Sequence, residues 1–287
     1  MRRVTANGLD FALLEAGEGP LALCLHGFPD SAHSFARLLP ALADGGFHAV
    51  APFMRGYAPS AVPADECYRL GALVADAVAL HEALGGDERA VIIGHDWGAE
   101  AAYGAAAFAP GRWRRAVTLA IPPFPLDFGL FNDYGQLRRF FYYFLMATPL
   151  AEPVLAADGM AFIDRLWRDW SPGLDGGEAL AEAKRSLARG ENLRAAIGYY
   201  RAVLDFPSDP DREPYAAEQA ALAEIGPQPT LYLHGSDDGC VALELVGDAE
   251  RYLSEASRME VIEGAGHFLH LERPDEVNER ILAFVDG

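Results

Sequence analysis

Gly94-His95-Asp96-Trp97-Gly98 is the stretch of sequence that decides the fold. It follows an apolar run at residues 90–93 that is typical of a buried strand, and it precedes an alanine-rich run at residues 99–109 that favours a helix. The two glycines allow a sharp turn between strand and helix, which holds one side chain out over a sheet edge. The pattern predicts that Asp96 is a nucleophile, rather than the helix N-cap that a lone aspartate would favour.

An aspartate in this position restricts the chemistry. Its ordinary pKa of about 3.9 leaves it charged near neutral pH, so it needs no base for activation. A carboxylate can displace a leaving group at a saturated carbon and form an alkyl ester, whereas attack on an amide would give a mixed anhydride that is no easier to reach. We therefore expect a substrate with an electrophilic sp3 carbon, such as an epoxide or an alkyl halide.

Two later motifs complete a catalytic set. An apolar strand pattern at residues 231–234 leads into Gly235-Ser236-Asp237-Asp238, and another at residues 261–262 leads into Gly264-Ala265-Gly266-His267. The chain order is thus nucleophile, acid, histidine. Together with His26-Gly27-Phe28-Pro29, these motifs resemble those of α/β-hydrolases of the epoxide hydrolase group, to which the haloalkane dehalogenases are related.

The resemblance covers nearly the whole chain and implies an α/β-hydrolase fold, with a mostly parallel sheet flanked by helices. The sequence pattern agrees, because strand and helix patterns alternate. Strands are expected at residues 21–25, 48–51, 91–93, 116–121, 230–234 and 259–262. Helices are expected at residues 35–43, 71–84, 99–108, 243–253 and 274–285.

The region at residues 122–215 breaks this alternation. It is rich in aromatic residues at helical spacing and is bounded by prolines. We interpret it as a helical cap inserted into a core formed by residues 1–121 and 216–287. In the family that the motifs resemble, such caps cover the nucleophile and shape the substrate pocket.

The resemblance also implies roles for individual residues. His267 would activate the water that hydrolyses the alkyl ester, and Asp238 would orient the imidazole. Asp237 is the rival acid, but the family spacing from Gly235 selects Asp238. The backbone N–H groups of Phe28 and Trp97 would form the oxyanion hole.

Two cap tyrosines would protonate the epoxide oxygen, by the same resemblance. Tyr200 directly precedes an arginine, as the family motif requires, which favours it over Tyr199. Tyr142 lies at a suitable distance before Pro149, but the residues between them depart from the family pattern, so Tyr143 stays open as an alternative. Aromatic residues on helices also commonly serve as core, as we expect for Trp167 and Trp170.

The sequence thus predicts a cofactor-independent epoxide hydrolase that uses Asp96, Asp238, His267, Tyr142 and Tyr200 on a small apolar epoxide. A haloalkane dehalogenase is the alternative, because Trp97 could hold a halide, although Phe28 stands where a second halide donor is common. A non-catalytic binding protein on the same fold is a further alternative, which the complete triad disfavours.

Composition excludes several other classes. The net charge of −19 argues against nucleic-acid or anionic-membrane partners. No apolar run is long enough to span a membrane, and the N-terminus lacks a signal-peptide core. Three widely spaced cysteines indicate a reducing, cytoplasmic setting, and no Cys/His cluster has zinc-ligand spacing, so we expect neither metal nor cofactor. A homodimer stays open.

Overall fold

The computed structural model describes residues 1–207 and 209–287, in which eight strands form one sheet of order β1-β2-β4-β3-β5-β6-β7-β8. All pairs from β4 to β8 are parallel, whereas β1 and β2 form an antiparallel edge. The strands are β1 (Arg2–Ala6), β2 (Leu9–Ala16), β3 (Leu21–Leu25), β4 (His48–Pro52), β5 (Val91–His95), β6 (Arg115–Leu119), β7 (Thr230–Gly235) and β8 (Arg258–Ile262).

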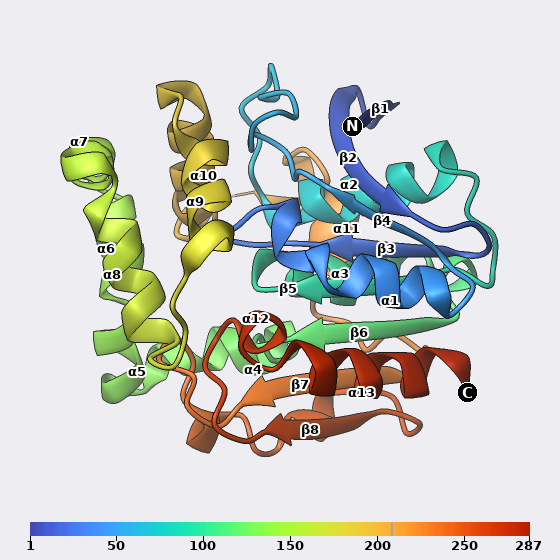
Figure 1. Ribbon diagram of the computed structural model, residues 1–287. Helices are drawn as coiled ribbons and strands as arrows, with labels where there is room; N and C mark the ends of the chain where they lie inside the picture. The colour runs from blue at the N-terminus through green and yellow to red at the C-terminus, as the bar shows by residue number, and fades with distance from the viewer. Residues whose placement is uncertain (208) are drawn as a thin grey trace.

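The central strands are buried on both faces, which is why they appear in the sequence as continuous apolar runs. The helices α1 (Leu38–Asp44), α12 (Leu269–Glu272) and α13 (Pro274–Asp286) lie on one face (Figure 1). The helices α2 (Leu70–Ala83), α3 (Trp97–Phe108) and α11 (Ala216–Ala221) pack together on the other. The predicted doubly covered parallel sheet is confirmed.

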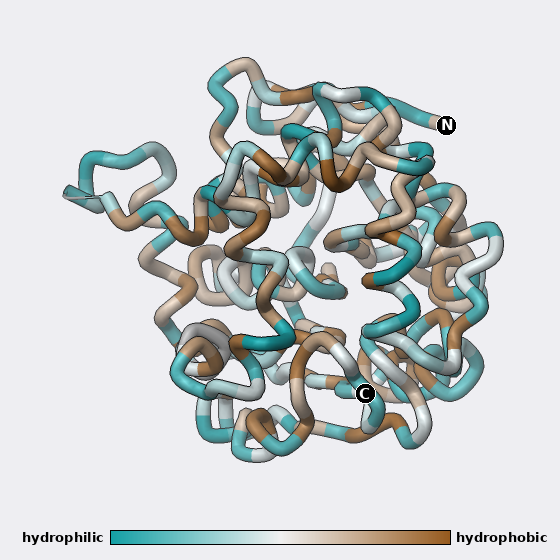
Figure 2. The backbone as a smooth tube through the Cα atoms, turned by 90° about the vertical axis from the view of Figure 1, so that its left-hand side faces the viewer, coloured by the Kyte–Doolittle hydropathy of each residue, from teal (hydrophilic) through white to brown (hydrophobic). Residues whose placement is uncertain are grey.

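The segment between β6 and α11 holds seven α-helices in its described residues: α4 (Phe124–Gly129), α5 (Tyr134–Arg139), α6 (Phe141–Met146), α7 (Ala151–Ala156), α8 (Ala161–Trp170), α9 (Gly177–Leu187) and α10 (Gly190–Val203). In Figure 1 most of them gather on the side toward which β6, β7 and β8 point. Figure 2 looks onto this side and shows hydrophobic and hydrophilic stretches alternating along the tube.

Helix α8 shows why these helices pack as they do. Its buried residues, Ile163, Leu166, Trp167 and Trp170, follow the i, i+3, i+4, i+7 pattern of an amphipathic helix with one apolar face. Functional side chains carried on such helices can therefore face the carboxyl ends of the strands, where ligands of open parallel sheets bind. The division into core and cap stays our prediction for residues 122–215.

Two elements differ from the sequence predictions. The hairpin β1–β2 was not expected, although Asn7 and Gly8 both have positive φ (44° and 72°) and form the Asn-Gly turn that favours a tight hairpin. The helix expected at residues 243–253 was wrong: only short 3₁₀ turns form, at Leu243–Leu245 and Ala249–Tyr252, on either side of Gly247, a poor helix former. In the part of the chain that the structure describes, no helix is long and apolar enough to cross a membrane.

Candidate active site

Asp96 occupies a strained turn between β5 and α3. Its φ of 52° and ψ of −122° are rare for a residue with a side chain, and such backbone strain is concentrated at functional sites. The turn depends on the flanking glycines. A Cβ at Gly94 would lie 2.0 Å from the Gly98 carbonyl oxygen, and one at Gly98 would lie 2.0 Å from the Leu25 carbonyl oxygen. The sequence therefore folds locally so that the Asp96 carboxylate projects from the end of the central strand.

The structure brings Asp96, Asp238 and His267 together, as the motif order predicts. His267 donates its Nδ1–H to Asp238 Oδ2 at 3.0 Å, and its Nε2 lies 3.5 Å from Asp96 Oδ2. The other oxygen of Asp238 accepts two backbone N–H groups, from Cys240 at 2.7 Å and Val241 at 2.9 Å. Asp237, the rival acid, is exposed and its carboxylate accepts the hydroxyl of Ser236.

The carboxylates next to His267 control its protonation. Burial alone would lower the pKa of His267, but the carboxylates of Asp238 and Asp96 outweigh it and raise that pKa to about 10. Burial alone would raise the pKa of Asp238, but the interaction with His267 lowers it. With both carboxylates charged, His267 therefore holds its second proton near neutral pH, between two anions.

The loop after β3 supplies a donor to Asp96. The Phe28 N–H donates to Asp96 Oδ1 at 2.7 Å, next to a cis Phe28–Pro29 peptide bond. Gly27 leaves room for this approach, because a Cβ there would lie 2.1 Å from Asp96 Oδ1. Trp97 is the first residue of α3, so its N–H is one of the helix-start donors that have no carbonyl partner within the helix.

Tyr200, on α10, faces the nucleophile from the helical side. Its ring meets those of Phe28 and Trp97 edge-on, with centroids 5.1 and 5.0 Å apart. Its hydroxyl is buried and has no hydrogen-bond partner among the described residues. Burial, followed by the charge of Asp96, raises the pKa of Tyr200 well above its usual value, so it stays a protonated donor.

Both candidates for the first cap tyrosine lie on α6 and contact Tyr200. The ring centroids of Tyr142 and Tyr143 are 5.5 and 4.8 Å from that of Tyr200, and both approach it edge-on. The Tyr142 hydroxyl lies 3.4 Å from the Cys240 Sγ, a contact that sequence reasoning missed. Burial raises the pKa of Tyr142 well above its usual value.

Two tryptophans expected to be core of the cap are buried, and they pack against the segments that carry His267 and Pro29. Trp170 packs edge-on against His267, with centroids 5.0 Å apart. Trp167 stacks on Phe268 and donates its indole N–H to the Pro29 carbonyl at 2.8 Å. They thus attach α8 to His267 and to the loop that donates to Asp96. Their helical spacing predicted burial but not what they would contact.

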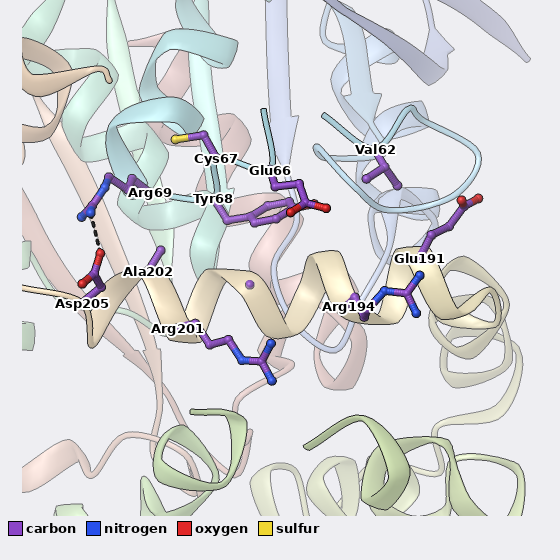
Figure 3. A pocket seen from close by; sticks show the side chains of 11 residues that line it. Val62, Glu66, Cys67, Tyr68, Arg69, Glu191, Arg194, Arg201, Ala202 and Asp205 are labelled. Atoms are coloured by element: carbon purple, nitrogen blue, oxygen red, sulfur yellow. Dashed lines mark hydrogen bonds and ion pairs between the residues drawn. The ribbon is translucent and has the colours of Figure 1, made fainter. Parts of the chain in front are cut away.

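A surface pocket of about 510 Å³ lies between the segment at residues 62–69 and α10 (Figure 3). Its charged groups pair locally: Arg69 binds Asp205 at 2.7 Å, and Arg194 binds Glu152 at 3.0 Å. Tyr68, which lines this pocket, stacks on Tyr199, whose other ring neighbours include Trp97. The pocket is nevertheless distinct from the catalytic group, because its lining includes none of Asp96, Asp238, His267, Tyr142 and Tyr200.

Comparisons with known proteins agree with this geometry. Residues 20–274 match the model of the α/β-hydrolase fold family. Epoxide hydrolase A of Mycobacterium tuberculosis is 31% identical over 100% of this chain and 97% of its own length. The chain belongs to the α/β-hydrolase family, in its epoxide hydrolase-like group.

Other members of this α/β-hydrolase group extend the comparison. The epoxide hydrolase of Caballeronia sordidicola is 29% identical over 98% of this chain and 92% of its own length. The crystal structure of epoxide hydrolase A from Mycobacterium thermoresistibile superposes with a TM-score of 0.78 at 27% identity, covering 100% of this chain and 98% of that one. The epoxide hydrolase of Bacillus megaterium, solved with an inhibitor, has a TM-score of 0.85 at 24% identity over the full length of both chains, and it supports the fold.

Proposed function

We propose that this enzyme hydrolyses epoxides to vicinal diols through an ester formed on Asp96. The observation that carries the proposal is that the two carboxylate oxygens of Asp96 have different neighbours. Oδ1 accepts the Phe28 N–H at 2.7 Å, whereas Oδ2 lies 3.5 Å from His267 Nε2. One oxygen is held by a backbone donor, and the other faces the catalytic base.

In the first step Asp96 Oδ2 attacks an epoxide carbon and the C–O bond of the ring breaks. The negative charge moves to the epoxide oxygen, which is strongly basic and needs a proton. Tyr200 and a phenol from α6, Tyr142 by preference, supply hydrogen bonds and the proton. The buried hydroxyl of Tyr200 supports this role, because it has no partner among the described residues and its raised pKa keeps it protonated.

In the second step water attacks the carbonyl carbon of the ester. Esterification neutralises Asp96, which removes one of the two anions that hold the proton on His267. His267 then gives its Nε2 proton to the phenolate that the first step leaves, and the neutral Nε2 accepts a proton from the attacking water while Asp238 stabilises the imidazolium. The tetrahedral intermediate collapses with cleavage of the ester C–O bond, and the imidazolium protonates the departing alkoxide of the diol. Charge develops on Oδ1, which already accepts the Phe28 N–H, and the Trp97 N–H is the second donor that we propose.

A panel of aryl and alkyl epoxides beside alkyl bromides tests the reaction class. We expect diol release from one or more epoxides, measured by chromatography, with no added metal or cofactor. A panel in which bromide is released and no epoxide is opened would contradict the proposal.

Haloalkane dehalogenation is the second candidate, and one observation favours it. The Trp97 indole nitrogen is buried without a hydrogen-bond partner among the described residues, so it could hold a halide. Phe28 provides no side-chain donor at the place where a second one is common, and the dehalogenase mechanism leaves the free Tyr200 hydroxyl unused. The bromide arm of the same panel measures this activity directly.

A further inference from the structure

A second cluster of polar side chains lies behind the catalytic group. Asp30 follows the loop that carries Phe28, His95 ends β5, and His270 lies in α12. All three are buried, with at most 3% of each residue exposed. One ligand atom from each of the three lies within 4.8 Å of the others.

The hydrogen bonds leave three lone pairs facing one another. His95 Nε2 lies 3.0 Å from the main-chain carbonyl of His267, which can only accept, so Nε2 carries the hydrogen and neutral His95 presents a lone pair on Nδ1. That atom lies 3.7 Å from Asp30 Oδ2, itself an acceptor. Among the described residues, neither atom has a hydrogen-bond partner, and nor does either nitrogen of His270.

We propose that Asp30, His95 and His270 bind one divalent transition-metal ion, with Zn²⁺ as the probe of choice. Buried polar atoms are ordinarily satisfied, and a buried carboxylate needs compensation of its charge. A single water donates only two hydrogen bonds, whereas one cation satisfies three lone pairs and neutralises the carboxylate. Two imidazoles and a carboxylate suit zinc and its neighbours rather than Mg²⁺ or Ca²⁺, which prefer oxygen ligands.

The geometry around each ligand suits this role. Ligand bonds to zinc of about 2.0–2.2 Å place the ligand atoms of a tetrahedral site about 3.3–3.6 Å apart, so ligand atoms that lie within 4.8 Å of one another need to close by about 1.5 Å at most. His95 donates its other N–H to a carbonyl, which is the usual outer-shell partner of a metal-ligating histidine. Asp30 and His270 are also held from outside the cluster. Asp30 Oδ1 accepts the Ser31 N–H at 2.7 Å, and the His270 ring stacks on Phe35.

The ion would act as a structural clamp. Its ligands come from the segment next to Phe28, from the end of β5 directly before Asp96, and from the helix that follows His267. The cluster is assembled from segments far apart in the chain, so the spacing of its residues in the sequence does not predict it. The inference does not depend on the epoxide reaction.

The test uses the full-length protein, stripped with EDTA, loaded with Zn²⁺ and freed of excess metal. We expect about one zinc per chain by elemental mass spectrometry and a thermal midpoint raised by several degrees, because an ion bound only by the folded state stabilises it. Mg²⁺ should do neither. Retention of no zinc, or no rise in the midpoint, would overturn the proposal and favour a water or an Asp30–His95 ion pair in the cluster.

The variant His270→Phe separates this site from surface binding. Phenylalanine preserves the ring that stacks on Phe35 and removes only nitrogens that have no partner among the described residues, so the fold should persist, as circular dichroism would check. It should lose the retained zinc and the midpoint shift. The control His48→Gln, at a partly exposed histidine beside Glu15, should keep both. If His270→Phe and wild type retain the same amount of zinc per chain, the metal binds elsewhere and the proposal is wrong.

A spectroscopic readout covers the case in which His270→Phe folds poorly. Co²⁺ should give visible absorption bands of a mixed nitrogen and oxygen site in wild type. Asp30→Asn, which preserves the shape of the side chain, should change or abolish these bands. Identical bands in that variant would exclude Asp30 as a ligand and contradict the site.

Discussion

The core half and the helical half of the active site differ in how their polar atoms are held. In the core, Asp238 accepts two backbone N–H groups and the His267 N–H, and Asp96 accepts the Phe28 N–H. In the helical half, the Tyr200 hydroxyl is buried without a partner among the described residues. In the proposed mechanism, the core thus fixes the groups that form and break covalent bonds, whereas the helices keep a donor available for the substrate oxygen.

This difference predicts a ranking of mutational effects. Removing a core group removes a chemical step, because no other group lies in its place. Removing a donor on the helices only weakens the stabilisation of one developing charge, and the step itself can still occur.

The largest loss is expected for Asp96→Ala. Without the carboxylate no ester can form, so turnover should fall by about ten-thousandfold or more, the scale on which nucleophile removal acts. Diol formation and intact-protein mass spectrometry measure the loss and the absence of an adduct. The matched control is Asp237→Ala, at the exposed neighbour of the triad acid, which should retain near wild-type activity. Substantial turnover by Asp96→Ala would show that Asp96 is not the nucleophile.

His267→Gln should separate the two steps. Attack by Asp96 needs no base, whereas ester hydrolysis does, so the variant should be alkylated but should not turn over. Intact-protein mass spectrometry should show a gain equal to the whole epoxide, and peptide mapping should place it on Asp96. A serine-type enzyme would fail at the first attack instead. An unmodified His267→Gln protein, or an adduct on another residue, is incompatible with the covalent mechanism.

Tyr200→Phe and Tyr199→Phe form a matched pair on one helix. Tyr200→Phe removes a hydroxyl with no protein partner among the described residues, so stability should hold while epoxide opening falls on the order of ten- to a thousandfold. Tyr199→Phe removes a hydroxyl that donates to the Arg55 carbonyl at 2.8 Å, so it should cost about 1–3 kcal/mol of stability and spare activity. Denaturant unfolding and single-turnover kinetics measure both. If Tyr199→Phe loses the activity, Tyr199 rather than Tyr200 is the donor to the epoxide oxygen.

The same division separates what the sequence could predict from what it could not. Asp96, Asp238 and His267 each follow a strand in a motif with constrained spacing, so residue types and chain order were enough to select them, and the structure brings them together. Asp238 was separable from Asp237 by spacing from Gly235 alone. The parallel sheet followed from the alternation of strand and helix patterns. These are local signals, and they belong to the strands of the sheet and the turns that follow them.

Contacts between segments were beyond the sequence. Helical spacing predicted burial for Trp170, but not its packing on His267, because periodicity shows which face is apolar and not what covers it. The Asp30, His95 and His270 cluster joins three distant segments. By contrast, the hairpin at Asn7 and Gly8 had a local turn signal that could have been used.

The smallest expected effect distinguishes Tyr142 from Tyr143, which are neighbours on α6 and both meet Tyr200 edge-on. The Tyr142 hydroxyl lies beside the Cys240 Sγ, and a thiol is a weak hydrogen-bond partner that a substrate alkoxide can displace. We therefore expect Tyr142→Phe to lower kcat for epoxide opening several-fold to about a hundredfold. Tyr143→Phe should leave kcat near wild type.

Combining these variants with Tyr200→Phe tests whether two phenols act on one oxygen. Groups that stabilise the same charge are coupled, so the double variant with Tyr142→Phe should lose less than the product of the single losses. A double variant with Tyr143→Phe should lose only what Tyr200→Phe loses. Single-turnover rates of ester formation give the four values for each cycle. Coupling to Tyr143 rather than Tyr142 would transfer the role by one residue, and coupling to neither would leave Tyr200 as the sole donor and contradict the two-phenol step.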